Sequence, residues 1–124
     1  MEFDHERLDV YKLSLDFLVF AERLLGAFPR GRAYFSDQLG RAALSIVLNV
    51  AEGAGKLSAP DKRRFYQIAR GSATESAALL DACQRVKLIT DADHRLGKEL
   101  LLRLVSMLVK LTRSFETPLL PDKF

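Results

Sequence analysis

The feature that most constrains this chain is a helical repeat of apolar residues along four long segments, interrupted at three places. In each segment apolar side chains recur every three or four residues, the spacing that places them on one face of an α-helix. The interruptions contain Gly, Pro or helix-capping residues and fall at 28–31, 53–60 and 89–91. We therefore predict helices over about residues 6–27, 34–54, 59–88 and 92–115.

Four helices of similar length joined by short loops predict an all-α fold, an antiparallel up-down-up-down four-helix bundle. A chain of 124 residues buries enough apolar surface for one core, so we expect a single domain over residues 1–124. Ser58 and Thr90 each stand three residues before an Asp, and both are expected to cap the helix that follows. Prolines in residues 118–121 predict a tail outside the last helix.

Composition excludes several classes of protein. With 48% hydrophobic and 28% charged residues, the chain is not expected to be disordered. A single cysteine, Cys83, and two histidines form no disulfide and no Cys/His metal site, so no cofactor or metal is expected. The acidic N-terminus does not resemble a signal peptide, and charged residues interrupt every apolar run. A soluble, cytoplasmic protein without a membrane partner is expected.

The apolar residues of the first segment form two stripes. Leu8, Tyr11, Leu15, Leu18 and Leu25 make one stripe, and Val10, Phe17, Phe20, Ala21 and Leu24 make the other. One bundle core cannot cover both stripes, and a long exposed apolar stripe indicates an interface. We therefore predict a homo-oligomer with Val10, Phe17, Phe20 and Leu24 at the contact.

The other three segments each carry one principal core stripe. On the second it comprises Leu39, Ala43, Ile46, Val47, Val50 and Ala54; on the third, Phe65, Ile68, Ala69, Ser72, Ser76, Leu79, Cys83 and Val86; on the fourth, Leu100, Leu104, Leu108, Leu111 and Phe115. Because Cys83 lies on a core stripe, it is interpreted as a small buried hydrophobic residue and not as a catalytic thiol.

A polar face on the second segment has two interpretations. Its members are Gln38, Arg41, Ser45, Asn49 and Glu52, and a hairpin with the third segment adds Glu75. That hairpin predicts the ion pairs Arg41–Glu75 and Glu52–Lys62. The face is either a hydrogen-bonded seam that fixes helix register or subunit contact, or a ligand or catalytic cleft. The seam is favoured, since an enzyme site more often includes a His or paired carboxylates.

A longer pattern resembles a known family. It contains Phe28-Pro29, Asp37-Gln38, Arg41-Ala42-Ala43-Leu44-Ser45-Ile46-Val47-Leu48-Asn49-Val50-Ala51-Glu52-Gly53, Arg64-Phe65-Tyr66-Gln67-Ile68-Ala69 and Gly71-Ser72-Ala73-Thr74-Glu75. In this order the motifs resemble the proteins encoded in intervening sequences of bacterial 23S ribosomal RNA genes. The resemblance implies an antiparallel four-helix bundle assembled as a cyclic homopentamer. It also suggests a likeness to the accessory variability determinant of diversity-generating retroelements, a basic pentamer that binds nucleic acid and a reverse transcriptase.

Charge is distributed unevenly along the chain. Residues 1–55 carry a net charge of −2, and residues 56–113 carry +6. The second half predicts two basic ridges: Lys56, Lys62, Arg63, Arg64 and Arg70 at the start of the third segment, and Arg95, Arg103, Lys110 and Arg113 on the fourth. The candidate phosphate-binding residues among them are Lys62, Arg63, Arg70, Arg95, Arg103, Lys110 and Arg113. Such ridges suit phosphate groups, so RNA or DNA is the partner that charge and resemblance together indicate. Binding is expected to be sequence-tolerant, since no recognition-helix or zinc-finger motif is present.

Two other functional classes compete with nucleic-acid binding. The first is a protein–protein interaction scaffold that binds no nucleic acid, with a reverse transcriptase as one partner by analogy. The second is an enzyme, which is not expected because no phosphate-binding loop or nucleophile with a neighbouring base is evident. His5 and His94 are interpreted as surface residues, and Gly53-Ala54-Gly55-Lys56 as a helix end and turn.

Overall fold

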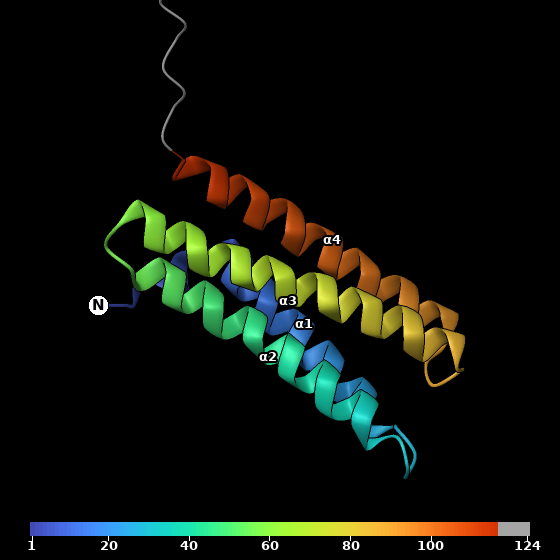
Figure 1. Ribbon diagram of the computed structural model, residues 1–124. Helices are drawn as coiled ribbons and strands as arrows, with labels where there is room; N and C mark the ends of the chain where they lie inside the picture. The colour runs from blue at the N-terminus through green and yellow to red at the C-terminus, as the bar shows by residue number, and fades with distance from the viewer. Residues whose placement is uncertain (117–124) are drawn as a thin grey trace, which may run out of the picture.

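The computed structural model describes residues 1–116, which fold into four α-helices preceded by one short 3₁₀ turn (Figure 1). The elements are η1 (Asp4–Arg7), α1 (Asp9–Gly26), α2 (Ala33–Gly55), α3 (Ala59–Arg85) and α4 (Asp91–Ser114). The four predicted helices are confirmed, and these described residues contain no strand. The tail predicted over residues 118–121 lies outside the described residues.

Two helix boundaries differ from the sequence prediction by more than one residue. The first helix begins at Asp9 because residues 4–7 form the separate 3₁₀ turn and Leu8 is extended. The third helix ends at Arg85, three residues earlier than predicted, and Lys87 then adopts a φ of 63° that reverses the chain. Ser58 and Thr90 cap α3 and α4 as predicted: their hydroxyls accept hydrogen bonds from the backbone N–H groups of Asp61 (3.2 Å) and Asp93 (3.0 Å).

Each α-helix packs against two others around a shared core. α2 lies between α1 and α3, and α4 contacts α3 and α1, while η1 packs against α2 and α1. Figure 1 shows α3 and α4 side by side, with α1 behind α2 and α3. The core stripe predicted for α2 is buried in full. No helix in residues 1–116 combines the length and apolar character needed to span a membrane.

The buried faces of α3 and α4 are rotated from the predicted stripes. In α3, Ala69, Ser76 and Cys83 are buried as predicted, but Tyr66, Ala73 and Leu80 are buried with them, and Ile68 and Val86 are exposed. In α4, Leu104 and Leu108 are buried as predicted and Leu101 joins them. The rotation arises because α3 contacts both α2 and α4, so its buried face points between its two neighbours.

The interface predicted on α1 is wrong, because its residues belong to the core. Val10, Phe17, Phe20 and Leu24 have exposed fractions of 4%, 0%, 7% and 4%. α2 and α4 flank α1, and the stripe that faces both of them is the buried one. The stripe assigned to the core is the more exposed: Leu15 reaches the solvent, as does the neighbouring Val19, which is 70% exposed.

Candidate nucleic-acid interface

The seven basic residues predicted to bind phosphate divide into two groups by exposure. Five are exposed, namely Arg70, Arg95, Arg103, Lys110 and Arg113. The ion pairs among residues 1–116 involve Arg7, Arg23, His94 and Lys98, so none of the five has a carboxylate partner there. Lys and Arg side chains in this state can contact an anion without first breaking an ion pair.

Lys62 and Arg63, in contrast, are half-buried and hold the ends of two helices. The Lys62 ammonium donates to the carbonyl oxygen of Ala54 (2.8 Å) and, more weakly, to that of Gly53 (3.4 Å). Arg63 Nη1 donates to the carbonyl oxygen of Phe115, directly after α4. The last carbonyls of a helix lack partners within the helix and carry partial negative charge, so a cation stabilises them. Sequence spacing did not predict this role.

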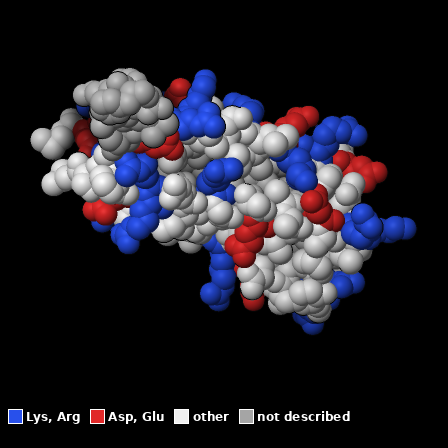
Figure 2. Space-filling model, turned by 45° about the horizontal axis from the view of Figure 1, so that its top comes forward, with Lys and Arg blue, Asp and Glu red and all other residues white. Residues whose placement is uncertain are grey.

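The exposed basic residues do not form one continuous patch on the face seen in Figure 2. Blue Lys and Arg side chains are separated there by white surface and by red Asp and Glu side chains. Along α4, the exposed Glu99 lies between Arg95 and Arg103 in sequence. On this face the basic side chains are spaced apart, an arrangement that suits several separate phosphate contacts along an extended ligand.

The centre of the predicted polar seam joins α2 to α3. The hydroxyls of Ser45 and Ser72 are 2.7 Å apart, and Asn49 Nδ2 donates to the Ser45 carbonyl oxygen (2.8 Å) and hydroxyl (3.0 Å). These three side chains are half-buried, so their hydrogen bonds form away from bulk water. The Ser45–Ser72 contact crosses from α2 to α3, whereas the Asn49 bonds stay within α2, so one polar contact links the two helices at the centre of the predicted seam.

The outer members of the seam do not contribute to it. Gln38, Arg41, Glu52 and Glu75 are all exposed. The predicted ion pairs Arg41–Glu75 and Glu52–Lys62 are wrong, since neither occurs among the described residues. Lys62 instead uses its ammonium on the α2 carbonyls. Arg41 is one of the residues that line a depression between α1 and α2.

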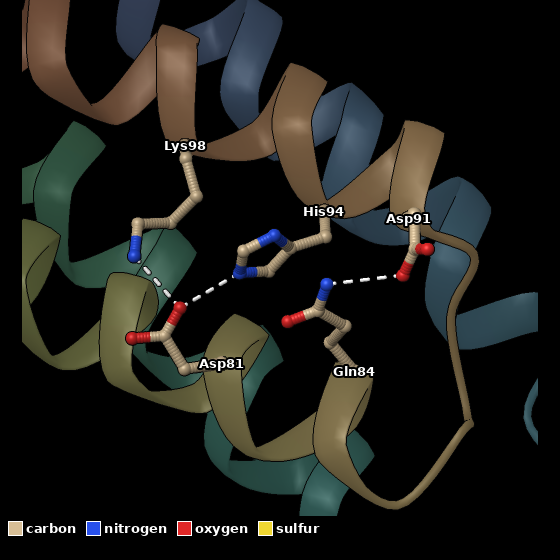
Figure 3. A network of polar contacts seen from close by, with 5 residues as sticks. All are labelled: Asp81, Gln84, Asp91, His94 and Lys98. Carbon is tan, nitrogen blue, oxygen red and sulfur yellow. Dashed lines mark hydrogen bonds and ion pairs between the residues drawn. The ribbon is translucent and has the colours of Figure 1, made fainter.

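A second polar cluster, which the sequence analysis missed, joins α3 to α4 (Figure 3). Asp81 Oδ1 accepts a hydrogen bond from Lys98 Nζ at 2.7 Å and lies 2.7 Å from His94 Nε2. Hydrogen bonding from Lys98, and then from His94, lowers the pKa of Asp81. Nearby, Gln84 donates to Asp91 (3.0 Å). A hairpin of the third and fourth segments brings Asp81 and His94 to the same level, so the sequence did contain a signal for this cluster.

An ion pair between α1 and α4 and the buried Cys83 thiol are two further features of the site region. Arg23 on α1 pairs with Asp93 on α4 at 2.8 Å, and hydrogen bonding to Arg23 lowers the pKa of Asp93. Cys83 is fully buried, and burial raises the pKa of its thiol. A buried thiol with a raised pKa is a poor nucleophile, which agrees with its interpretation as a small core residue.

Apolar side chains are exposed on the outer face of α1 and α2. Leu15 and Val19 on α1, and Leu44 and Leu48 on α2, are exposed. Leu18, Leu25 and Leu44 line the depression between the two helices, together with polar residues that include Glu22, Asp37 and Arg41. An apolar surface with a polar rim is typical of a protein-binding face.

Comparison with known proteins identifies a family whose model matches the chain and a solved structure of similar fold. A family model described as 23S rRNA-intervening sequence protein matches residues 6–110. A solved structure of similar fold is a protein of unknown function from the S23 ribosomal protein family of Bacteroides thetaiotaomicron VPI-5482. The two chains are 23% identical with a TM-score of 0.79, and the match covers 84% of this chain and 95% of that one. None of the curated proteins matches this chain.

Proposed function

This chain belongs to the 23S rRNA-intervening sequence protein family, and from that premise we propose that it is a non-enzymatic, oligomeric protein that binds nucleic acid without sequence preference, directly or as an adaptor. One observation carries the proposal. Arg70 on α3 and Arg95, Arg103, Lys110 and Arg113 on α4 are exposed without a carboxylate partner among residues 1–116. Lys and Arg contacts to phosphate provide affinity and carry no sequence information.

The proposal includes an antiparallel up-down-up-down order of the helices. Short loops join successive helices. Contacts between helix ends support this order: Arg23, late in α1, pairs with Asp93, early in α4. Likewise Arg63, early in α3, bonds to Phe115, which follows α4. A helix whose end lies beside the start of its neighbour runs in the opposite direction to it.

The proposal also includes assembly of the bundle as a cyclic homopentamer in the cytoplasm. The exposed apolar residues Leu15, Val19, Leu44 and Leu48 support a contact on the outer face of α1 and α2. Each chain has a formal net charge of +3, so a pentamer would carry about +15 and repeat every basic residue five times. Repetition converts weak phosphate contacts into substantial avidity.

A gel-shift titration with RNA and with DNA at two salt concentrations tests the proposed binding. We expect a shift at low salt that weakens at high salt. Lys and Arg side chains that bind phosphates release counterions from the nucleic acid, and added salt opposes that release. The double variant Arg103→Glu with Lys110→Glu should weaken binding, whereas Arg103→Lys with Lys110→Arg should preserve it. Absence of a shift at low salt, or a shift insensitive to the charge reversal, would contradict nucleic-acid binding through α4.

A protein–protein interaction scaffold is the second candidate function, and the exposed apolar face of α1 and α2 favours it. In that case the assembly would bind another protein, with a reverse transcriptase as one candidate by analogy, and no nucleic acid. Purification of the native assembly, with sequencing of bound nucleic acid and mass spectrometry of bound proteins, separates the two. Recovery of a stoichiometric protein without nucleic acid would favour the scaffold.

A further inference from the structure

Two cations lie over one aromatic ring where α2 ends and α3 begins. Lys56 Nζ and Arg64 Cζ are each 4.9 Å from the centroid of the Phe65 ring. Lys56 follows the last residue of α2, and Arg64 belongs to the second turn of α3. Neither cation takes part in an ion pair within residues 1–116. The ring therefore positions two charges that the described carboxylates do not neutralise.

The neighbouring basic residues point elsewhere, which distinguishes this pair. In the run Lys62-Arg63-Arg64, the first two side chains bond to carbonyl oxygens at the ends of α2 and α4. Only Arg64 is left exposed. The two inward bonds also fix the start of α3 against its neighbours, so they hold Phe65 and its two cations in place.

The local charge balance separates this region from the opposite turn. Residues 56–70 contain five basic residues and one acidic residue, Asp61. Near the turn between α3 and α4, by contrast, Lys98 and Arg23 are paired with Asp81 and Asp93. An anion approaching Lys56 and Arg64 meets positive charge that has no competing ion pair to displace.

We propose that Lys56, Phe65 and Arg64 form the principal contact for a single-stranded nucleic acid, an inference that rests on the proposed nucleic-acid binding. Two cations within about one Debye length of each other act together on neighbouring phosphates. Their contacts with the ring restrict them before binding, which reduces the entropy lost on association. A guanidinium over a ring also offers a flat cationic face on which a base stacks, a feature that favours nucleic acid over an acidic peptide.

Fluorescence anisotropy with a labelled single-stranded RNA of mixed sequence, at about 50 mM and about 200 mM salt, tests the proposal. Lys56→Gln with Arg64→Gln should raise Kd at least about tenfold at the lower salt. If both residues contact phosphate, the slope of log K against log salt should fall by about 1.4, since each single-strand contact contributes about 0.7. Lys12→Gln with Arg85→Gln is the matched control, because it removes one Lys and one Arg charge from exposed positions on α1 and α3 that belong to neither basic ridge, and it should change Kd much less.

A second variant separates loss of binding from loss of fold. Lys56→Arg with Arg64→Lys retains both charges and their contacts with Phe65, and should bind nearly as the wild type does. The proposed contact is wrong if the wild type binds RNA and Lys56→Gln with Arg64→Gln binds it as well as the wild type or the control pair does. Nucleic-acid binding itself would then stand. A wild-type protein that binds no RNA overturns both proposals. Tighter binding to polyglutamate than to RNA of equal charge would assign the pair to an acidic protein.

Discussion

At the scale of single residues, neighbouring basic side chains have different roles because their surroundings differ. Lys62 and Arg64 are two positions apart, yet one bonds to carbonyls of α2 and the other lies exposed over Phe65. Sequence spacing predicts the helix face of a residue, but it does not predict that a carbonyl of another helix lies within its reach. Which basic side chains are exposed to a ligand therefore depends on how α2, α3 and α4 pack.

Replacing Lys62 should destabilise the fold even though its charge is on the surface side of α3. Lys62→Met removes the hydrogen bonds to Gly53 and Ala54, and we expect a loss of about 1 kcal/mol in the free energy of unfolding. Urea denaturation measures it. Arg70→Met, at an exposed position without an ion pair, is the control and should stay within about 0.5 kcal/mol of the wild type. Equal stability of the two variants would contradict a helix-end role for Lys62.

The Asp81 cluster should make a small, pH-dependent contribution to stability. Because Lys98 and His94 lower the pKa of Asp81 in the folded protein, its contribution is present above the ordinary value of about 4 and is lost as pH falls through the folded value. Asp81 is half-exposed, so Asp81→Asn should cost less than about 1 kcal/mol at pH 7.

Thermal denaturation from pH 7 down to about pH 2 measures this effect. The difference in melting temperature between wild type and Asp81→Asn should shrink below about pH 4. Asp16→Asn serves as control, because Asp16 is exposed and forms no ion pair among the described residues. A difference that persists unchanged at the lowest pH would argue against the contacts of the Asp81 carboxylate as its source.

At the scale of elements, helix existence was predictable and helix orientation was only partly so. The four helices and the caps at Ser58 and Thr90 followed from periodicity and turn residues. The two stripes on α1 were also visible in the sequence. Periodicity gives the angle between two stripes but not which one faces inward, because that depends on the helices beside them. The polar seam was found at Ser45 and Asn49, whereas its exposed ends were not distinguished from its centre.

Close helix packing makes Gly97 difficult to replace. A Cβ at this position would lie 2.5 Å from Leu80 Cδ1 and 2.7 Å from Phe20 Cε1, so the side chains of Leu80 and Phe20, or α4 itself, must shift. Gly97→Ala should therefore lower the free energy of unfolding by about 1–3 kcal/mol, despite the better helix propensity of Ala.

Gly71 provides the matched comparison in urea denaturation. It lies inside α3, and a Cβ there would meet nothing within 4 Å. Gly71→Ala should raise stability by up to about 1 kcal/mol, because Ala restricts the unfolded backbone and favours the helix. If Gly97→Ala proved as stable as Gly71→Ala, the close contact of α4 with Phe20 and Leu80 would be in error.

At the scale of the whole molecule, the proposed assembly should depend on the outer face of α1 and α2. Leu15→Glu with Val19→Glu places charge on exposed apolar positions and should shift the protein toward monomer at micromolar concentration. Light scattering after size separation measures the mass. Leu102→Glu, on α4 and about as exposed as Val19, is the control and should leave the mass unchanged. A monomeric wild-type protein would contradict the assembly itself.

Tyr66 gives the protein an internal optical reporter. Its ring is buried beside Gly53 at the start of α3, the chain contains no Trp, and burial raises the pKa of the Tyr66 hydroxyl. When folding raises the pKa of a phenol, the free energy of unfolding falls as pH rises above the ordinary phenol pKa of about 10, because the unfolded state ionises first. In an alkaline titration followed by phenolate absorbance near the ultraviolet edge, Tyr66 should therefore ionise together with the loss of helical signal. Because Tyr11 and Tyr34 absorb as well, subtracting the titration of Tyr66→Phe from that of the wild type isolates the ultraviolet absorbance of this one phenol, whose change would then time the opening of the core.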